Sequence, residues 1–519
     1  MKPSMSYDQA VHELQTMSER RLNAIWDLGA IGDSRAVPVI LDVMLNGDAE
    51  FCRNCVAILM NFDDRRAVPM ILKALDKYQE IQVSEECIAV LDYFKDYTAT
   101  PTVLRRLPQH KQDENHTLAA LYYLIHAADP AMKGAMLDLV GDTKNSQRVR
   151  VLALEALETL HDPSIGAQII PLINEKENPV VAGRAALLAG RVGIREAIAN
   201  LVQLLPVPMP YRQLPALQGL AGLQDPAAVE PLAQFLSVDD PELRLAAVDG
   251  LAAFRQPELA TYLISSLGDG DAVVRAHAAT GLGNCGSASA VPALLKALKD
   301  EHAAVRTAAA EALGKYRGAR KELTARLADA SAEVRATVVQ ALGATGDPTC
   351  APALAARLAD ADAGVRAAAA TALARLGEGA VPAILPLLKA GKPVVRARAA
   401  ETLGRLKATP AIPALTARLA DPSPLVRLWA LSALGEMPQP PQKAIKQGFK
   451  DADPAVRTEA ARVVDRRHLT ALARALLPLL TTGTRPERAA AYAALCTLAG
   501  KDLGPTPSAW EAWVKETGK

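Results

Sequence analysis

Aromatic residues are scarce in this sequence: Phe, Trp and Tyr make up 4% of its 519 residues. Large aromatic side chains supply much of the apolar area of an ordinary globular core, so a core of that kind is not expected. The hydrophobic content is nevertheless 50%, and alanine is abundant. Small residues with high helix propensity allow helices to pack closely, so this composition favours an all-α protein.

The sequence also lacks the signals of export and membrane insertion. Its first 21 residues are polar and charged, without the apolar segment of a signal peptide. No run of about 18 apolar residues predicts a membrane span. The six cysteines, at positions 52, 55, 87, 285, 350 and 496, form no extracellular disulfide framework. We expect a cytoplasmic protein with reduced thiols.

A large net charge is missing too, but the two halves of the chain differ. The net charge is +1. Residues 1–270 hold 24 Lys+Arg against 35 Asp+Glu, and residues 271–519 hold 34 against 22. This asymmetry suggests either an acidic partner for the second half or self-association through acidic and basic halves.

A repeat of about 30 residues dominates the chain from residue 244 onward. One arginine marks each repeat: Arg244, Arg275, Arg306, Arg335, Arg366, Arg396, Arg427 and Arg457. In five repeats an aspartate stands six residues before the arginine: Asp300, Asp329, Asp360, Asp421 and Asp451. A fixed period of this length indicates a solenoid, in which each repeat packs only on its neighbours.

Each repeat is predicted to be a helical hairpin. In the unit 305–328, the first segment has apolar residues at helical spacing and stops near Gly314, where glycine can end a helix. A polar turn leads to a second helix. Pro292, Pro382 and Pro413 fall in the first turn of such second helices, where proline breaks no hydrogen bond.

The marker arginines are expected to be structural. A cation in the first turn of a helix faces the positive end of the helix dipole, which is unfavourable by up to ~1 kcal/mol. The aspartate that precedes it is well placed to cap the helix and to pair with arginines of its own and adjacent repeats. The sequence therefore predicts a ladder of Asp–Arg pairs along the stack.

The repeat resembles the HEAT repeat, and more narrowly the bacterial HEAT-like repeats grouped with phycobilisome lyases. The shared pattern is A-V-P-A-L-L-x-x-L, a short Asp loop, then V-R-x-x-A-A-x-A-L-G, and it is strongest over 219–465. The resemblance implies an α-solenoid of about 16 hairpins that forms a right-handed superhelix. It also implies that first helices lie outside and second helices line the concave surface.

Four regions are expected along the chain. Residues 1–205 hold divergent, acidic repeats, and the proline-rich segment 206–215 forms a connection that could act as a hinge. Residues 216–485 hold regular repeats, which are basic from 271, and 486–519 form a capping repeat. In the cap, Trp510 and Trp513 would cover the last hydrophobic face.

Motifs that would indicate chemistry are weak. Gly281–Gly286 matches a dinucleotide-binding fingerprint by letter but closes a helix instead of joining a strand to one. Cys52 and Cys55 have metal-ligand spacing without a complementary pair. One His-Glu pair, His12-Glu13, cannot assemble the di-iron site of deoxyhypusine hydroxylase, a HEAT-like enzyme. We expect no metal, no cofactor and no catalytic residues.

The second helices of the basic half carry the candidate binding residues. They are Lys296, Lys299, Arg326, Arg357, Lys389, Arg418, Lys446 and Lys450, together called the basic row below. If second helices line the concave surface, the basic row forms a stripe about 50–60 Å long. A solvated polar face is the plain alternative, and an acidic protein segment is the functional one.

We therefore expect a non-catalytic scaffold or adaptor that binds a protein partner along its concave surface. Two alternatives stay open: a chromophore lyase-like or protein-modification enzyme, and a nucleic-acid-binding HEAT protein. Nucleic acid is disfavoured because the whole chain is neutral and stacking aromatics are few.

Overall fold

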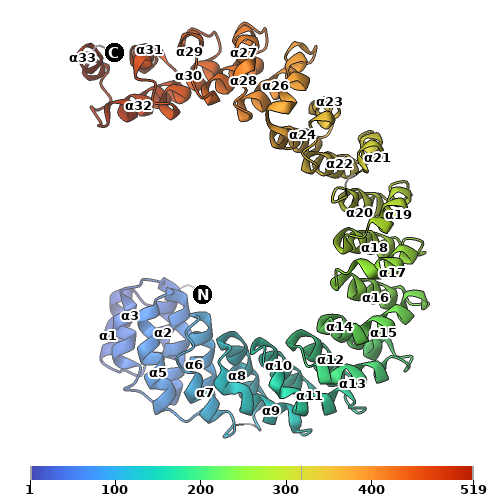
Figure 1. The fold of residues 1–519 in the computed structure, drawn as a ribbon. Coiled ribbons are helices and arrows are strands. Elements are labelled where there is room, and N and C mark those ends of the chain that lie inside the picture. The colour runs from blue at the N-terminus through green and yellow to red at the C-terminus, as the bar shows by residue number, and fades with distance from the viewer. Residues whose placement is uncertain (1–2, 111, 317, 517–519) are drawn as a thin grey trace. The chain divides into compact units, whose positions relative to one another are not determined.

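The computed structural model describes residues 3–110, 112–316 and 318–516, and the regular structure in these residues is entirely helical. Antiparallel helix pairs follow one another along the chain (Figure 1). The first helices of the pairs are α2 (Arg21–Ile31), α4 (Ala49–Leu59), α6 (Ile81–Tyr93), α8 (Glu114–Ala127), α10 (Gln147–Thr159), α12 (Pro179–Val192), α14 (Pro210–Leu223), α16 (Pro241–Ala253), α18 (Ala272–Cys285), α20 (Ala303–Leu313), α22 (Ala332–Ala344), α24 (Ala363–Leu376), α26 (Pro393–Arg405), α28 (Pro424–Glu436), α30 (Pro454–Arg466) and α32 (Arg485–Ala499).

Second helices are shorter, and many of them begin with a 3-10 turn. They are α3 (Ala36–Val43), α5 (Val68–Lys77), α7 (Thr100–Arg106), α9 (Lys133–Gly141), α11 (Gly166–Ile173), α13 (Ile198–Leu204), α15 (Val229–Ala233), α17 (Ala260–Ser266), α19 (Val291–Ala297), α21 (Arg320–Arg326), α23 (Ala351–Ala356), α25 (Val381–Ile384), α27 (Ile412–Arg418), α29 (Gln442–Gly448) and α31 (Ala473–Thr482). An additional helix, α1 (Tyr7–Gln15), precedes the pairs, and α33 (Pro507–Glu516) follows α32.

Residues close in sequence set the helix ends. Asp271 caps α18 by accepting hydrogen bonds from the Val273 and Val274 amides, which have no partner inside the helix. Pro292 stands in the first turn of α19, and Pro382 and Pro413 stand there in α25 and α27. The hairpin prediction and the all-α solenoid are confirmed.

The chain divides into two compact units, up to Ala253 (unit 1) and from Phe254 (unit 2). The proline-rich connection is shorter than expected, because Pro210 begins α14 and Pro215 lies inside it. The first helices of the two adjoining repeats, α12 and α14, are in backbone contact: a Cβ on Gly190 of α12 would come within 2.6 Å of the Gly219 Cα of α14. The connection between α13 and α14 is limited to residues 205–209.

First helices approach one another closely within unit 2. A Cβ on Gly283, Gly314 or Gly404 would come within 2.8 Å, 2.8 Å and 2.7 Å of an alanine on the next first helix. Helix separation depends on the side chains at the contact. The first helices of unit 2 are therefore more tightly spaced than its second helices. Figure 1 shows the first helices α18–α32 on the inner side of the curve of unit 2 and the second helices on its outer side.

This arrangement corrects the expectation that second helices line the concave surface. In unit 2 they lie on the outer side (Figure 1), because small residues at the first-helix contacts shorten that row. The glycine at Gly314 has a right-handed φ of −59°, so its role is close approach and not the left-handed turn that commonly ends a helix.

One stretch within the described residues, Ala363–Lys389, has the length and hydropathy of a possible membrane span. It is not one straight helix. The chain turns at Gly377, which has φ +63°, and continues into the second helix of the hairpin. α24 itself has 14 residues, about 21 Å, which is short of the ~30 Å apolar layer of a bilayer. The large apolar side chains Val365, Leu373, Ile384 and Leu388 of this stretch are buried in the hairpin core.

The last repeat is covered by α33. Trp510 is fully buried, and Trp513 and Val514 are buried beside it in one hydrophobic cluster with Leu479 and Leu495. The Trp510 indole N–H donates to the Gly504 carbonyl at 2.8 Å, so the buried nitrogen is satisfied. α33 thus covers an apolar face that would otherwise be exposed.

Candidate binding surfaces

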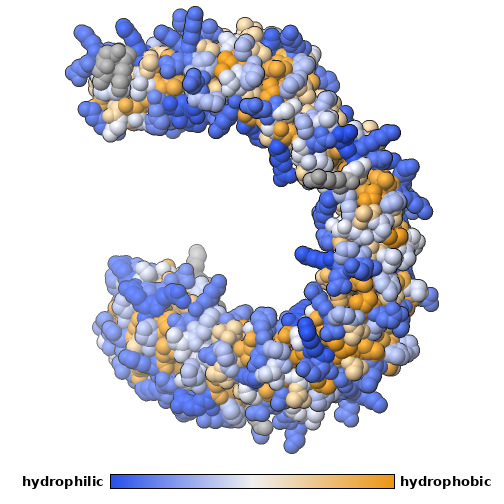
Figure 2. Space-filling view, in the orientation of Figure 1, coloured by the Kyte–Doolittle hydropathy of each residue, from blue (hydrophilic) through white to orange (hydrophobic). Residues whose placement is uncertain are grey.

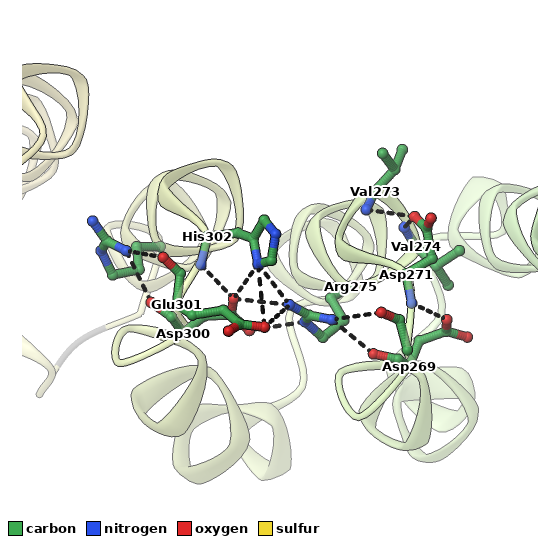
Figure 3. A network of polar contacts seen from close by, with 10 residues as sticks. Asp269, Asp271, Val273, Val274, Arg275, Asp300, Glu301 and His302 are labelled. Carbon is green, nitrogen blue, oxygen red and sulfur yellow. Dashed lines mark hydrogen bonds and ion pairs between the residues drawn. The ribbon is translucent and has the colours of Figure 1, made fainter.

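Arg275 shows how a marker arginine is held (Figure 3). Its Nη1 donates to the Asp269 and Gly270 carbonyls of its own loop, at 2.9 and 3.2 Å. Its Nε and Nη2 donate to the two carboxylate oxygens of Asp300 in the next repeat, at 2.8 and 3.0 Å. One guanidinium therefore joins two loops with strong, bidentate hydrogen bonds.

The same arrangement recurs along unit 2. The bidentate pairs are Arg275–Asp300, Arg306–Asp329, Arg335–Asp360, Arg396–Asp421 and Arg427–Asp451, with N–O distances of 2.7–3.0 Å. We call this set the ladder. Hydrogen bonds from Arg335 lower the pKa of Asp360, and the bond to Asp360 raises the pKa of Arg335.

The ladder aspartates differ from the expected helix caps in two ways. Asp360 accepts from the amide of Asp362, and Asp362 is the residue that caps α24. The ladder aspartate therefore lies in the loop, two residues before the cap. It reaches its own repeat's arginine, Arg366, through its backbone carbonyl at 2.8 Å and not through its carboxylate.

Sequence reasoning missed the acidic partner of Arg457 and two further arginines of this series, Arg488 and Arg150. Arg457 donates to Glu487 at 2.6 Å, and Arg488 donates to the Gly483 carbonyl. In unit 1, Arg150 binds both oxygens of Glu175, at 2.7 and 2.6 Å. The 31-residue spacing from Arg457 could have revealed Arg488. The other two pairs use glutamate, which the Asp–Arg pattern does not find.

Arg366 differs from the ladder arginines, because no carboxylate from the next repeat binds it in the described part of the chain. Its Nη1 keeps the two loop bonds, to the carbonyls of Asp360 and Ala361. Its Nε is buried without a hydrogen-bond partner in the described part of the chain. Ala390 occupies the position where the other repeats have the ladder aspartate.

The basic row lies on the outer, second-helix side of unit 2 (Figure 1), or at the ends of those helices. Arg357 and Arg418 lie 3.5 and 3.4 Å from the ladder aspartates Asp360 and Asp421, so part of their charge is already compensated. The other members are partly or fully exposed: Lys296, Lys299, Arg326, Lys389, Lys446 and Lys450. The basic row is therefore not a concave stripe.

Exposed large apolar side chains occupy a different surface. Nine are found among the described residues: Trp26, Tyr93, Tyr122, Val180, Met209, Tyr211, Val273, Val394 and Leu425. Eight lie on first helices, two, six, nine or thirteen residues after the cap, and Met209 precedes α14 directly. Positions at this spacing share one side of a helix. We call the surface that these nine residues form the first-helix face.

Charged groups surround these apolar residues. In unit 1, Arg148 donates to the Tyr122 hydroxyl at 3.2 Å, and His126 lies 2.8 Å from Asp92. In unit 2, Arg398 and Arg405 both bind Glu401, at 2.6 and 2.9 Å. Figure 2 likewise shows hydrophobic patches alternating with hydrophilic side chains on the visible face.

The cysteines and the glycine motif have structural surroundings. Cys52, Cys55 and Cys87 are buried, and burial raises the pKa of Cys52 to about 12, which keeps its thiol protonated. Within the described residues no group of three His, Cys, Asp or Glu side chains could hold a metal ion. Gly281–Gly286 lies at the end of α18, without the strand that dinucleotide binding needs.

Stacked helical hairpins with one open face define an α-solenoid of the kind that binds other molecules along a surface. A model of HEAT repeats matches residues 207–276, 261–325, 320–389, 381–445 and 412–496, and a PBS lyase HEAT-like repeat matches 20–46. The first model covers more than half of the sequence. The chain belongs to the HEAT-repeat family. No curated protein matches it.

Several solved structures are similar in fold. The Kap95:Nup1 complex is 13% identical with a TM-score of 0.52, over 96% of this chain and 83% of that chain. The karyopherin Kap121p, bound to the extreme C-terminus of the phosphatase Cdc14p, is 11% identical with a TM-score of 0.49, over 98% and 83%. At these identities the likeness concerns the fold alone.

Proposed function

We propose that this protein is a non-catalytic scaffold that binds a protein partner along its first-helix face. The observation that carries this proposal is the location of the exposed apolar side chains. The described residues form fifteen second helices and sixteen first helices, yet the nine exposed large apolar residues all lie on first helices or directly before one. Contiguous apolar patches mark interaction sites, and we infer that these side chains, which recur on one surface, contribute to one.

The chemistry of this face suits a protein segment. Aromatic side chains contribute most of the binding energy in many protein interfaces, and a polar rim excludes water from them. Tyr93 and Tyr122 are exposed on successive first helices of unit 1, α6 and α8, and Arg148 donates to the Tyr122 hydroxyl. His126 is exposed one turn after Tyr122 on α8. A partner with apolar anchors between acidic residues would match both the tyrosines and the neighbouring basic side chains.

Photo-crosslinking in the native host tests this proposal. A photoreactive phenylalanine analogue at Tyr122 is expected to capture one partner, whereas the same analogue at Lys73, on the second helix α5, captures none. Tyr93→Ser with Tyr122→Ser should then lower the affinity of the isolated partner by about tenfold or more. Equal capture from both positions would contradict the proposal.

The basic row supports a second candidate, an acidic protein segment on the outer side of unit 2. Charge reversal at Arg326, Arg357 and Arg418 is a poor test, because Arg357 and Arg418 lie beside ladder aspartates. Lys296, Lys389 and Lys446 are exposed, so Lys→Glu changes there test binding alone. Loss of an acidic partner in this variant, and weaker binding in salt, is the expected result; unchanged affinity excludes the outer row.

A further inference from the structure

We propose that Arg366 forms a binding site for a carboxylate of a partner protein. At five positions of the ladder, a marker arginine directs Nε and Nη2 at the carboxylate of an aspartate from the next repeat. At Arg366 the chain supplies no such carboxylate, because the corresponding residue is Ala390. An acidic side chain of an extended peptide would complete the pair.

The guanidinium is already held in the binding orientation. Arg366 Nη1 donates to the Asp360 and Ala361 carbonyls, both at 2.8 Å. Arg335, which does have an aspartate, makes the corresponding two bonds at 2.9 and 3.2 Å. The anchoring half of the interaction is therefore intact, and an arginine fixed in this way loses little freedom when it binds a carboxylate.

The loop of the next repeat, which contains Ala390, also keeps the backbone geometry of the ladder. Ala390 has φ −59° and ψ 148°, and Asp360 has φ −59° and ψ 150° at the same position. The carbonyls of Ala390 and Gly391 accept from Arg396 at 2.9 Å, as in the other repeats. The replacement of aspartate by alanine thus removes the carboxylate without changing the backbone around it.

The charge of this loop favours an acidic ligand. Corresponding loops have the sequence Asp-Gly-Asp at 269–271 and Asp-Ala-Asp at 360–362 and 451–453. The loops at 329–331 and 421–423 keep one aspartate each, whereas the loop at 390–392 is Ala-Gly-Lys, so one or two carboxylates are lost and one cation is gained. Lys389 and Lys392 are exposed on either side of the loop, and Arg366 is partly exposed.

An unpaired guanidinium nitrogen makes this position costly for the chain alone. Arg366 Nε is buried and has no acceptor in the described residues, and an unsatisfied buried donor destabilises a folded protein. A peptide carboxylate that binds the accessible part of the partly exposed guanidinium would add a charge-assisted hydrogen bond beside this nitrogen. The site lies at loops on one edge of unit 2 and does not depend on the first-helix face.

Ala390→Asp is the decisive variant, because it supplies the missing carboxylate from within the chain. Binding of a fluorescein-labelled octaglutamate peptide is measured by fluorescence anisotropy at low salt. We expect Ala390→Asp to weaken binding about tenfold or more. Ala420→Asp adds the same charge one loop further along, beside the occupied pair Arg396–Asp421, and should weaken binding less than threefold.

Equal effects of the two variants would overturn the proposal, because they would show only general electrostatic attraction. Acetate distinguishes a small carboxylate from a peptide: we expect it to compete only at millimolar concentrations. If acetate binds wild type as tightly as octaglutamate does, the peptide assignment is wrong. Folding is checked by thermal unfolding, in which Ala390→Asp should be at least as stable as wild type. Failure of the Tyr122 crosslinking would not affect these results.

Discussion

Gly404 lies so close to Ala433 on the next first helix that a Cβ on Gly404 would come within 2.7 Å of the Ala433 Cα. Gly404→Ala is therefore expected to destabilise unit 2 by about 1–3 kcal/mol through overpacking, despite the higher helix propensity of alanine. Gly391→Ala is the control, since a Cβ there meets no atom within 4 Å. Equal thermal stability of the two variants would contradict this account of the contact.

The ladder should stabilise unit 2 in a pH-dependent manner. The hydrogen bonds of Arg335 hold the pKa of Asp360 below its ordinary value, so the contribution is complete above the unfolded pKa, about 4, and is lost as pH falls through the folded pKa. Asp360→Asn should cost about 2–4 kcal/mol at pH 7, and the difference should shrink in acid. Glu436→Gln, in an exposed pair, should change stability by less than about 1 kcal/mol.

His116 should make unit 1 less stable in mild acid. It is fully buried, its Nε2 lies 3.0 Å from the Ser84 hydroxyl, and burial lowers its pKa to about 4. The unfolded chain takes up this proton near pH 6.5, so unfolding becomes easier as pH falls from 6.5 towards 4, by at most about 1.4 kcal/mol per pH unit. Comparison of chemical unfolding at pH 7 and 5 measures this loss.

His116→Gln should reduce that pH dependence, although the variant itself is less stable at pH 7. His12→Gln is the matched control, because His12 is exposed on α1. The assignment to His116 fails if His116→Gln retains the full difference between pH 7 and pH 5.

Removal of the terminal cap should loosen only the last repeats. Trp510→Ala removes a fully buried side chain and should cost about 3–5 kcal/mol. Because repeats contact only their neighbours, hydrogen exchange should accelerate in α31 and α32 and stay unchanged in α18 and α20. Glu511→Ala, at an exposed position, should leave the exchange pattern unaltered.

The sequence was sufficient to predict the hairpins, because local signals determine them. Pro292, Pro382 and Pro413 mark the first turns of second helices, where a missing N–H breaks no hydrogen bond. The inner side of the curve was predicted wrongly, because that expectation came from the resemblance to the HEAT repeat. The pattern within one repeat did not show that Gly314, at the end of α20, lies against Ala341 in the next repeat. Contacts between repeats, and not the pattern within one, decide which row is inside.

The binding surface could be predicted only in part. The basic row was visible as charge, but compensation of Arg357 and Arg418 by ladder aspartates requires knowledge of neighbouring loops. Exposure of Tyr93 and Tyr122 depends on which side of each helix is covered by residues about 30 positions away. The absence of aspartate at Ala390, by contrast, could have been found by counting.

Each ladder pair joins an arginine to the aspartate of the following repeat, and most repeats of unit 2 carry both residues. The two ends of such a repeat are therefore interchangeable with those of its neighbours. Excision of one complete period between Arg275 and Arg335 would bring an orphaned arginine against an equivalent aspartate. A solenoid built in this way can lengthen or shorten in evolution by whole repeats, while a partial deletion would leave charges without partners.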